Sequence, residues 1–254
     1  MPEGPSIVIL KELILPLHLE HQRVKSVEGN TSIDKERLVN QEVIAFKSWG
    51  KHFLICFKDF SLRIHFMLFG TYRINERKET VARLSLKFDH DELNFYTCSL
   101  QFIEGDINET YEWSADVMSD TWDPHAALKK LQSKPKLLAC DALLDQTIFA
   151  GVGNIIKNEV LYRIKVQPAS EIGALPITVL EILIAEARTY SFDFLKWKKE
   201  FTLKKHWLAH TRRLCKRCNL PMHKEYMGKT NRRTFFCVNC QQEYNPEMNL
   251  VKES

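Results

Sequence analysis

The spacing of apolar residues changes between residues 114 and 124, from the two-residue period of strands to the period of helices. In residues 82–88 apolar and polar side chains alternate, which is typical of a strand with one buried face. Beyond residue 124 apolar residues recur at i, i+3 and i+4, which is typical of amphipathic helices. The pattern therefore predicts an α+β chain in which a mostly antiparallel β domain precedes a helical domain.

Element boundaries follow from the same pattern and from helix-terminating residues. The pattern predicts an opening helix over residues 6–15, which Pro16 ends, and strands over residues 43–46, 53–57, 82–88 and 93–97. It predicts further helices over residues 124–131 and 136–144, one after an N-cap at Asn154, and one from Pro176 onward. The expected domains are a β-sandwich over residues 1–115, a linker over 116–123, a helical domain over 124–205, a cysteine-rich module over 206–245 and a tail over 246–254.

Composition and charge narrow the class of protein. The 254 residues are 44% apolar, enough for a sizeable core, and their apolar runs are too short to cross a membrane. Glu3 and the lack of a basic region before the first apolar residues argue against a signal peptide, so we expect a cytoplasmic protein, associated with the nucleoid if bacterial. Residues 196–240 hold 13 Lys and Arg against 2 Asp and Glu, whereas residues 1–195 hold 22 against 27. This asymmetry indicates a nucleic-acid-binding surface, with a solvated lysine-rich face as the alternative.

Four of the seven cysteines form two Cys-x-x-Cys pairs. Two such pairs, Cys215/Cys218 and Cys237/Cys240, with a hairpin tip predicted at Met227-Gly228-Lys229 between them, suit one tetrahedral zinc ion. Four protein ligands leave no open position, so the zinc would be structural. Rubredoxin-like iron and a dithiol redox pair are the alternatives. Cys56, Cys98 and Cys140 are interpreted as core thiols.

The chain begins Met1-Pro2-Glu3-Gly4-Pro5, and removal of Met1 would leave a proline with a free secondary amine. An N-terminal amine has a pKa of about 7.7–8.0, against about 10.4 for lysine, so a substantial fraction is unprotonated near neutral pH. Such an amine can attack an electrophilic carbon and form an iminium ion with an aldehyde. The alternative is an ordinary helix start with Pro5 in the first turn.

Two further stretches carry a functional and a structural interpretation. The backbone N–H groups from Gly151 through Gly153 to Asn154, at a helix N-terminus, would suit a phosphate, although such a turn also simply links helices. Met67, Leu68 and Phe69 would be core residues in a strand, but in a loop they would form an apolar wedge able to enter a base stack.

Taken in order, these residues resemble the formamidopyrimidine-DNA glycosylase/endonuclease VIII (Fpg/Nei) family of DNA-repair enzymes. The resemblance runs from Pro2 to Cys240 and rests on these matches: Pro2-Glu3-Gly4-Pro5, Gly50-Lys51, Gly151-Val152-Gly153-Asn154 with Glu159, Arg232, and the cysteine pairs ending in Cys240-Gln241. It implies an N-terminal helix with an antiparallel β-sandwich, a helix–two-turns–helix domain and a zinc-finger hairpin. It further implies a monomer that binds damaged double-stranded DNA.

The resemblance also implies residue roles. Pro2 matches the nucleophile that forms a Schiff base on C1′, and Glu3 the acid that protonates the sugar-ring oxygen. Lys51 matches a phosphate contact that also serves proton donation during β-elimination. Asn154 and Arg232 match phosphate-binding residues, while Met67, Leu68 and Phe69 match the residues that fill the gap left by an extruded base.

The gap-filling residues all lie in one stretch, and the stretch around Cys98-Ser99-Leu100-Gln101-Phe102 lacks an arginine. Both features resemble endonuclease VIII, which implies oxidised pyrimidines as the preferred substrates. The alternatives are an Fpg-type enzyme preferring 8-oxoguanine or formamidopyrimidine, and a non-catalytic zinc-containing protein that binds damaged DNA. A tautomerase also uses a terminal proline, but the zinc ribbon and the basic segment argue against that class. Ser6 departs from the Glu of many relatives, which puts in doubt any proton transfer by a carboxylate there.

Overall fold

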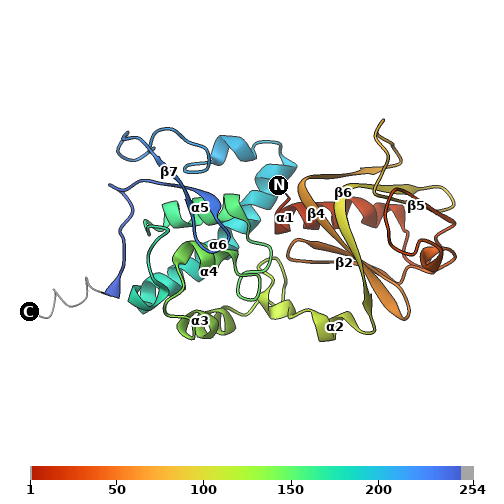
Figure 1. The fold of residues 1–254 in the computed structure, drawn as a ribbon, viewed down its shortest axis with the longest axis horizontal. Coiled ribbons are helices and arrows are strands. Elements are labelled where there is room, and N and C mark those ends of the chain that lie inside the picture. The colour runs from red at the N-terminus through yellow and green to blue at the C-terminus, as the bar shows by residue number, and fades with distance from the viewer. Residues whose placement is uncertain (1, 247–254) are drawn as a thin grey trace, which may run out of the picture. The chain divides into compact units, whose positions relative to one another are not determined.

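The computed structural model describes residues 2–246, and the chain divides into two compact units between Glu112 and Trp113 (Figure 1). The first unit contains the strand-rich half of the sequence, and the second contains the helical half together with the cysteine pairs. This division lies slightly before residue 115, where we expected the β domain to end. The α+β class is confirmed.

One long helix, six strands and three short helices form the first unit. In chain order they are α1 (Gly4–Ile14), β1 (Ser26–Glu28), β2 (Ala45–Trp49), β3 (His52–Cys56), β4 (Phe60–Ile74), β5 (Leu84–Lys87) and β6 (Glu92–Glu104), with the short helices η1 (Leu15–Leu17), η2 (Glu36–Leu38) and α2 (Ile107–Thr110). The strands pair antiparallel in one six-stranded sheet, in the order β1-β5-β6-β4-β3-β2. Figure 1 shows the two long central strands, β4 and β6, side by side.

The core of the first unit is apolar. Ile7, Leu10 and Ile14 of α1 are buried in the same cluster as Phe53 of β3 and Phe95 of β6. Burying a side chain of this size contributes about 1.5–3 kcal/mol relative to leaving it exposed. The predicted first helix is thus confirmed. Its buried apolar residues pack the N-terminal segment against the sheet.

Local patterns misjudged parts of the first unit. The predicted strand over residues 43–46 begins only at Ala45, and the strand predicted over 93–97 extends over 92–104 as β6. Long-range pairing with β4 extends β6, and short-range periodicity does not report such pairing. Ser85 lies on the polar face of the alternating stretch 82–88 but is buried, and its hydroxyl donates to the side-chain oxygen of Asn94.

The second unit is helical with a terminal hairpin. Its elements are η3 (Trp113–Ala115), α3 (Pro124–Gln132), α4 (Ala139–Leu144), α5 (Asn154–Arg163), η4 (Ile172–Ala174), α6 (Ile177–Lys199), η5 (Leu203–His206), β7 (His223–Met227) and β8 (Arg232–Phe236). The predicted helices over 124–131 and from Pro176 are confirmed. Gly228, with φ of 74°, lies at the hairpin tip, as predicted. No helix in residues 2–246 combines the length and apolar character needed to cross a membrane.

Two helix starts differ from the sequence prediction. The helix predicted from residue 136 begins at Ala139, because residues 137–139 instead pair with residues 170–172 through backbone hydrogen bonds. The N-cap of α5 is Gly153, and Asn154 is the first helical residue. Because of this one-residue shift, the Asn154 side chain does not cap the helix. It contacts strand β8 instead, as described below.

Candidate active site and nucleic-acid interface

The start of α1 positions the predicted nucleophile and acid. Glu3 is the N-cap of the helix and is completely buried, while Pro2 before it is partly exposed. The Ser6 hydroxyl accepts a hydrogen bond from the Glu3 backbone N–H at 3.4 Å, and the Ser6 N–H donates to the Glu3 carbonyl at 2.8 Å. Ser6, the departure from the family pattern, therefore fixes the backbone of Glu3. A buried carboxylate needs hydrogen-bonding partners. Its complete burial therefore distinguishes Glu3 from an ordinary surface glutamate.

Lys51 lies in the tight turn between β2 and β3. Gly50, with φ of 52°, adopts the left-handed conformation that this turn requires, and the pair Trp49 and His52 closes it. The ring of His65 on β4 lies with Nδ1 3.2 Å from the Lys51 carbonyl oxygen. The Lys51 turn is therefore held both by its own hairpin and by the neighbouring strand.

A ring cluster supports this turn. The rings of His52 and His65 meet edge-on at 5.2 Å, and His52 Nδ1 lies 3.1 Å from the Tyr111 hydroxyl, with Trp49 packed on both His52 and Tyr111. Burial, together with the charge of Arg63, lowers the pKa of His52 to about 3, and burial also lowers the pKa of His65. Burial raises the pKa of Tyr111 to about 12. The lowered pKa values favour the uncharged form of both histidines, and the ring contacts hold the turn in place. Sequence reasoning missed it because its members are scattered over four segments.

The three apolar residues 67–69 are exposed. Met67, Leu68 and Phe69 are 51%, 55% and 78% exposed, although they lie within β4 and not in a separate loop. Between the pairs Phe66–Cys98 and Thr71–Tyr96, the four residues 67–70 of β4 oppose the single residue Thr97. This irregular bulge directs bulky side chains to solvent, which excludes the core interpretation of these residues. A Cβ on Gly70 would lie 2.8 Å from the Thr97 carbonyl oxygen, so only glycine fits there.

In the second unit the turn before α5 differs in part from the prediction. Residue 151 has a φ of 99°, a backbone conformation that favours glycine. The Gly151 N–H donates to the Gln146 side chain at 3.1 Å. The Val152 N–H donates to the Phe149 carbonyl. The expectation that all four N–H groups from Gly151 to Asn154 form an anion site is therefore wrong for the first two.

Helix α5 holds the strand that carries Arg232. The Asn154 side-chain amide donates to the Arg233 carbonyl at 2.8 Å, Lys157 Nζ donates to the Thr234 hydroxyl at 2.7 Å, and the Phe235 N–H donates to Asn158 Oδ1 at 3.2 Å. Lys157 and Asn158 are buried. Three residues of one helix thus anchor three consecutive residues of β8, directly after the exposed Arg232. These contacts hold the strand that begins at Arg232, and the Arg232 side chain remains exposed at the surface.

Glu159, the next residue of α5, holds the connection that leads to the first cysteine pair. Its carboxylate accepts hydrogen bonds from the N–H groups of Leu208, Ala209 and His210 at 2.8–3.0 Å. Burial raises the pKa of Glu159, although these three donors oppose the shift. Burial likewise lowers the pKa of His210 to about 4. The signal for these roles was visible in the sequence as three consecutive polar residues, 157–159, inside an otherwise apolar helix.

The four predicted zinc ligands come together. The sulfur atoms of Cys215, Cys218, Cys237 and Cys240 all lie within 4.8 Å of one another, and the Cys215–Cys240 and Cys218–Cys237 separations are 3.8 and 3.5 Å. Zn–S bonds of about 2.3 Å in a tetrahedron require sulfur separations of about 3.8 Å. The geometry and the all-thiolate donor set therefore fit a structural zinc site. Beside it, the Gln241 side chain accepts from the Cys237 N–H and donates to the Val166 carbonyl, both at 2.8 Å.

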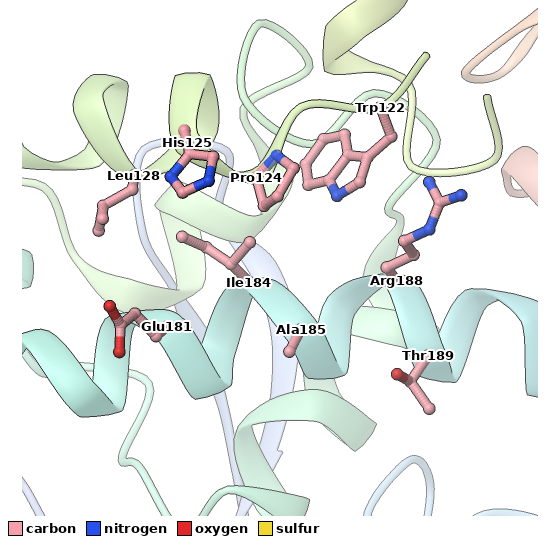
Figure 2. A pocket seen from close by; sticks show the side chains of 9 residues that line it. All are labelled: Trp122, Pro124, His125, Leu128, Glu181, Ile184, Ala185, Arg188 and Thr189. Carbon is pink, nitrogen blue, oxygen red and sulfur yellow. The ribbon is translucent and has the colours of Figure 1, made fainter. Parts of the chain in front are cut away.

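A separate pocket of about 510 Å³ lies between α3 and α6 (Figure 2). Figure 2 shows the side chain of Ile184 on α6 pointing toward Pro124. Its lining includes no residue predicted to act on DNA or to bind metal. We therefore assign it no part in the candidate site.

Two family models match the chain. The formamidopyrimidine-DNA glycosylase N-terminal domain matches residues 1–102, and the formamidopyrimidine-DNA glycosylase H2TH domain matches residues 114–189. The crystal structure of Lactococcus lactis formamidopyrimidine-DNA glycosylase, bound non-covalently to DNA containing an AP site, superposes with a TM-score of 0.82. That match has 21% identity and covers 95% of this chain and all of the other. The fold is thus that of a DNA glycosylase with a helix–two-turns–helix region and a four-cysteine hairpin.

Curated relatives agree with the family models. Endonuclease 8-like 3 of Mus musculus is 30% identical over 221 residues, which cover 83% of this chain and 36% of that protein. Formamidopyrimidine-DNA glycosylase of Mycoplasma genitalium is 27% identical over 277 residues, which cover 95% of this chain and 96% of that protein. This chain thus spans little more than a third of the endonuclease 8-like 3 relative. It belongs to the Fpg/Nei family of base-excision-repair DNA glycosylases.

Proposed function

We propose that this protein is a bifunctional DNA glycosylase and AP lyase that removes oxidised bases, pyrimidines in preference, from double-stranded DNA. The observation that supports this proposal most directly is the start of α1. There Pro2 directly precedes Glu3, a buried carboxylate whose backbone is fixed by Ser6. A nucleophile beside a buried acid is the arrangement that base displacement followed by ring opening requires.

The first chemical step requires the removal of Met1, because an amide nitrogen is not nucleophilic. The freed Pro2 nitrogen attacks C1′, the bond from C1′ to the base breaks, and the base leaves with a proton. Glu3 protonates the ring oxygen O4′ as the sugar opens, so that the nitrogen–carbon bond becomes an iminium ion. The iminium ion withdraws electrons from C2′, and loss of a C2′ proton expels the 3′ phosphate. A second elimination expels the 5′ phosphate, and water then hydrolyses the iminium bond, which releases the sugar remnant from Pro2 and leaves a gap in the strand.

The remaining candidate residues bind and position DNA. Lys51, on its supported turn, serves as a cation for a phosphate near the lesion and as a proton donor during β-elimination. Arg232 and Asn154 contact the phosphate backbone, which positions the duplex without reading its sequence. An arginine can bind phosphate through two parallel hydrogen bonds. The anchoring of β8 on α5 supports such a role, because a fixed strand loses little freedom when Arg232 binds.

The exposed bulge supports duplex DNA as the substrate. Extruding a base costs a few kcal/mol, and the cost is lowest for a damaged pair. Apolar side chains inserted into the stack can fill the space the base leaves. We assign this role to Met67, Leu68 and Phe69, and their grouping in one strand supports the preference for oxidised pyrimidines. The four cysteines would hold one structural zinc ion, which would stabilise the hairpin carrying Arg232.

Borohydride trapping on a duplex with an abasic site tests the proposal. Borohydride reduces the iminium ion to a stable amine, so the wild-type protein is expected to form a covalent protein–DNA adduct. Pro2→Gly is expected to abolish or strongly reduce the adduct, because the proline ring no longer holds the attacking nitrogen in place, whereas Lys51→Ala retains it and slows strand cleavage. Mass spectrometry of the same preparation checks that Met1 has been removed.

Absence of an adduct with processed wild-type protein that still binds the duplex would favour the non-catalytic alternative. The lesion preference is tested separately, by measuring excision from duplexes that differ only in the damaged base. Faster removal of 8-oxoguanine than of an oxidised pyrimidine would favour an Fpg-type enzyme.

A further inference from the structure

The turn that follows α6 presents an aromatic ring to solvent. Phe201 is 95% exposed, more than any other large apolar residue described in residues 2–246. Its φ of 57° lies in the left-handed region, which a bulky side chain rarely adopts and which favours glycine. The position thus combines an exposed ring with a backbone conformation that phenylalanine does not favour, and neither feature contributes to a core.

The turn is held in place by its surroundings. The Phe201 N–H donates to the Lys198 carbonyl at 3.2 Å, and the Thr202 N–H donates to the Trp197 carbonyl at 2.8 Å. The Trp197 ring stacks on His206 of η5 with centroids 4.1 Å apart and planes within 3° of parallel. These contacts join the end of α6 to η5 across the turn. The ring of Phe201 is therefore displayed from a rigid base.

The charges around the turn are almost all positive. Lys198 and Lys199 precede Phe201, Lys204 and Lys205 follow it, and all four are exposed. Glu200 is the single acidic residue of this stretch. An apolar protein partner would find one isolated ring among lysines here, whereas a nucleic acid offers both phosphates for the lysines and a flat base for the ring.

We propose that the Phe201 turn, residues 198–205, binds an unpaired stretch of DNA, with the Phe201 ring stacked on a nucleobase and the lysines on the neighbouring phosphates. The inference rests on the proposed function for the choice of DNA as the nucleic acid. Stacking of a base on an aromatic side chain is tolerant of sequence and contributes substantially to single-strand binding, and the lysine contacts add a salt-dependent part. A base held in a duplex stack exposes only its edges, so this surface favours single-stranded over paired DNA.

The test measures the affinity of the full chain for a lesion-free single-stranded oligonucleotide by fluorescence anisotropy. Phe201→Gly is the informative change, because glycine suits the left-handed backbone and removes only the ring. Its affinity is expected to fall about tenfold. Phe201→Trp keeps a stacking surface and is expected to retain the affinity. Lys204→Ala is expected to weaken binding and to lower the dependence on salt concentration.

The matched control is Phe192→Ala. Phe192 is also an exposed aromatic residue of α6, at 40%, but its ring contacts Arg188 and it lies outside the lysine-rich turn. Its removal is expected to leave single-strand affinity unchanged. Equal affinities of the wild type and Phe201→Gly would overturn the inference. That outcome is distinct from failure of the proposed function, which is read from wild-type borohydride trapping on the abasic duplex.

Discussion

The two units of this protein carry their buried polar groups in different ways. In the first unit the core is apolar, and the candidate chemistry lies at the edges of elements: Glu3 at a helix start, Lys51 in a turn and residues 67–69 at a bulge. In the second unit charged and polar residues of α5 lie inside, and they hold the hairpin and the cysteine-rich connection by specific hydrogen bonds.

The two units therefore keep their candidate sites in place by different kinds of contact. The core of the first unit is held mainly by apolar packing and strand pairing, although the hydrogen bond between Ser85 and Asn94 is also buried. Buried polar contacts are less tolerant, because removal of one partner leaves the other without a hydrogen bond in a dry environment. We therefore expect polar substitutions to damage the second unit more than the first, and the following predictions test that expectation.

The largest effect is expected from loss of the metal. Wild-type protein is expected to contain about one zinc per chain and Cys237→Ser to lose it. Structural zinc sites contribute an apparent free energy of about 10–16 kcal/mol to folding, so the hairpin β7–β8 should lose its hydrogen-exchange protection. Metal analysis and hydrogen exchange measure the two effects. Strands β4 and β6 should keep their protection.

Cys98→Ser is the matched control in the first unit. Cys98 is also a buried cysteine, but it lies in an apolar core and burial raises the pKa of its thiol to about 12. Its substitution should cost about 1–3 kcal/mol through a buried hydroxyl and leave the zinc content unchanged. Full zinc content in Cys237→Ser would contradict the assignment of the site.

An intermediate effect is expected for Glu159→Gln. The carboxylate accepts three backbone N–H groups, whereas an amide has one acceptor oxygen and would turn an NH₂ group toward a donor. The free energy of unfolding should fall by about 3 kcal/mol, measured by denaturant unfolding of the second unit. Glu104→Gln in the first unit is the contrast, because the exposed pair of Arg37 with Glu104 should contribute little. Equal losses in the two variants would contradict the comparison.

The smallest effect is expected in the stability of the first unit, which should depend on pH because of His52. Its pKa is about 3 in the folded state, so between pH 6.5 and 3 the unfolded chain binds the extra proton. Stability is therefore fully present above pH 6.5 and declines as the pH falls, by about 2 kcal/mol at pH 5. Thermal unfolding across this range measures the decline. His52→Gln should make the stability of the first unit less dependent on pH. If the dependence of stability on pH is unchanged in this variant, other groups cause the effect.

Much of the fold could be predicted from local patterns. The helix from residue 124, the long helix from Pro176 and the hairpin tip at Gly228 all appeared as expected, because capping residues, prolines and periodicity act within a few positions. Two errors in element boundaries have the same cause. The predicted strand over residues 93–97 is shorter than β6, and the helix predicted from residue 136 begins earlier than α4. Pairing with distant segments decides both boundaries.

The candidate site divides in the same way. The cysteine pairs and the terminal Pro2-Glu3 could be identified from residue type and spacing, because their chemistry is local. The exposure of residues 67–69 could not, because alternation along β4 does not reveal a bulge set by its register with β6. The rings beneath Lys51 and the partners of Lys157 also come from segments far apart in sequence.

From the sequence alone, short motifs kept in a fixed order were enough to predict the α+β class, the four cysteines of the candidate metal site and the family. Tertiary packing was needed to know which way Met67, Leu68 and Phe69 face and how α5 holds the strand of Arg232. Those outcomes depend on distances between residues remote along the chain. Such distances are set by packing and strand register, which no local pattern of residues encodes.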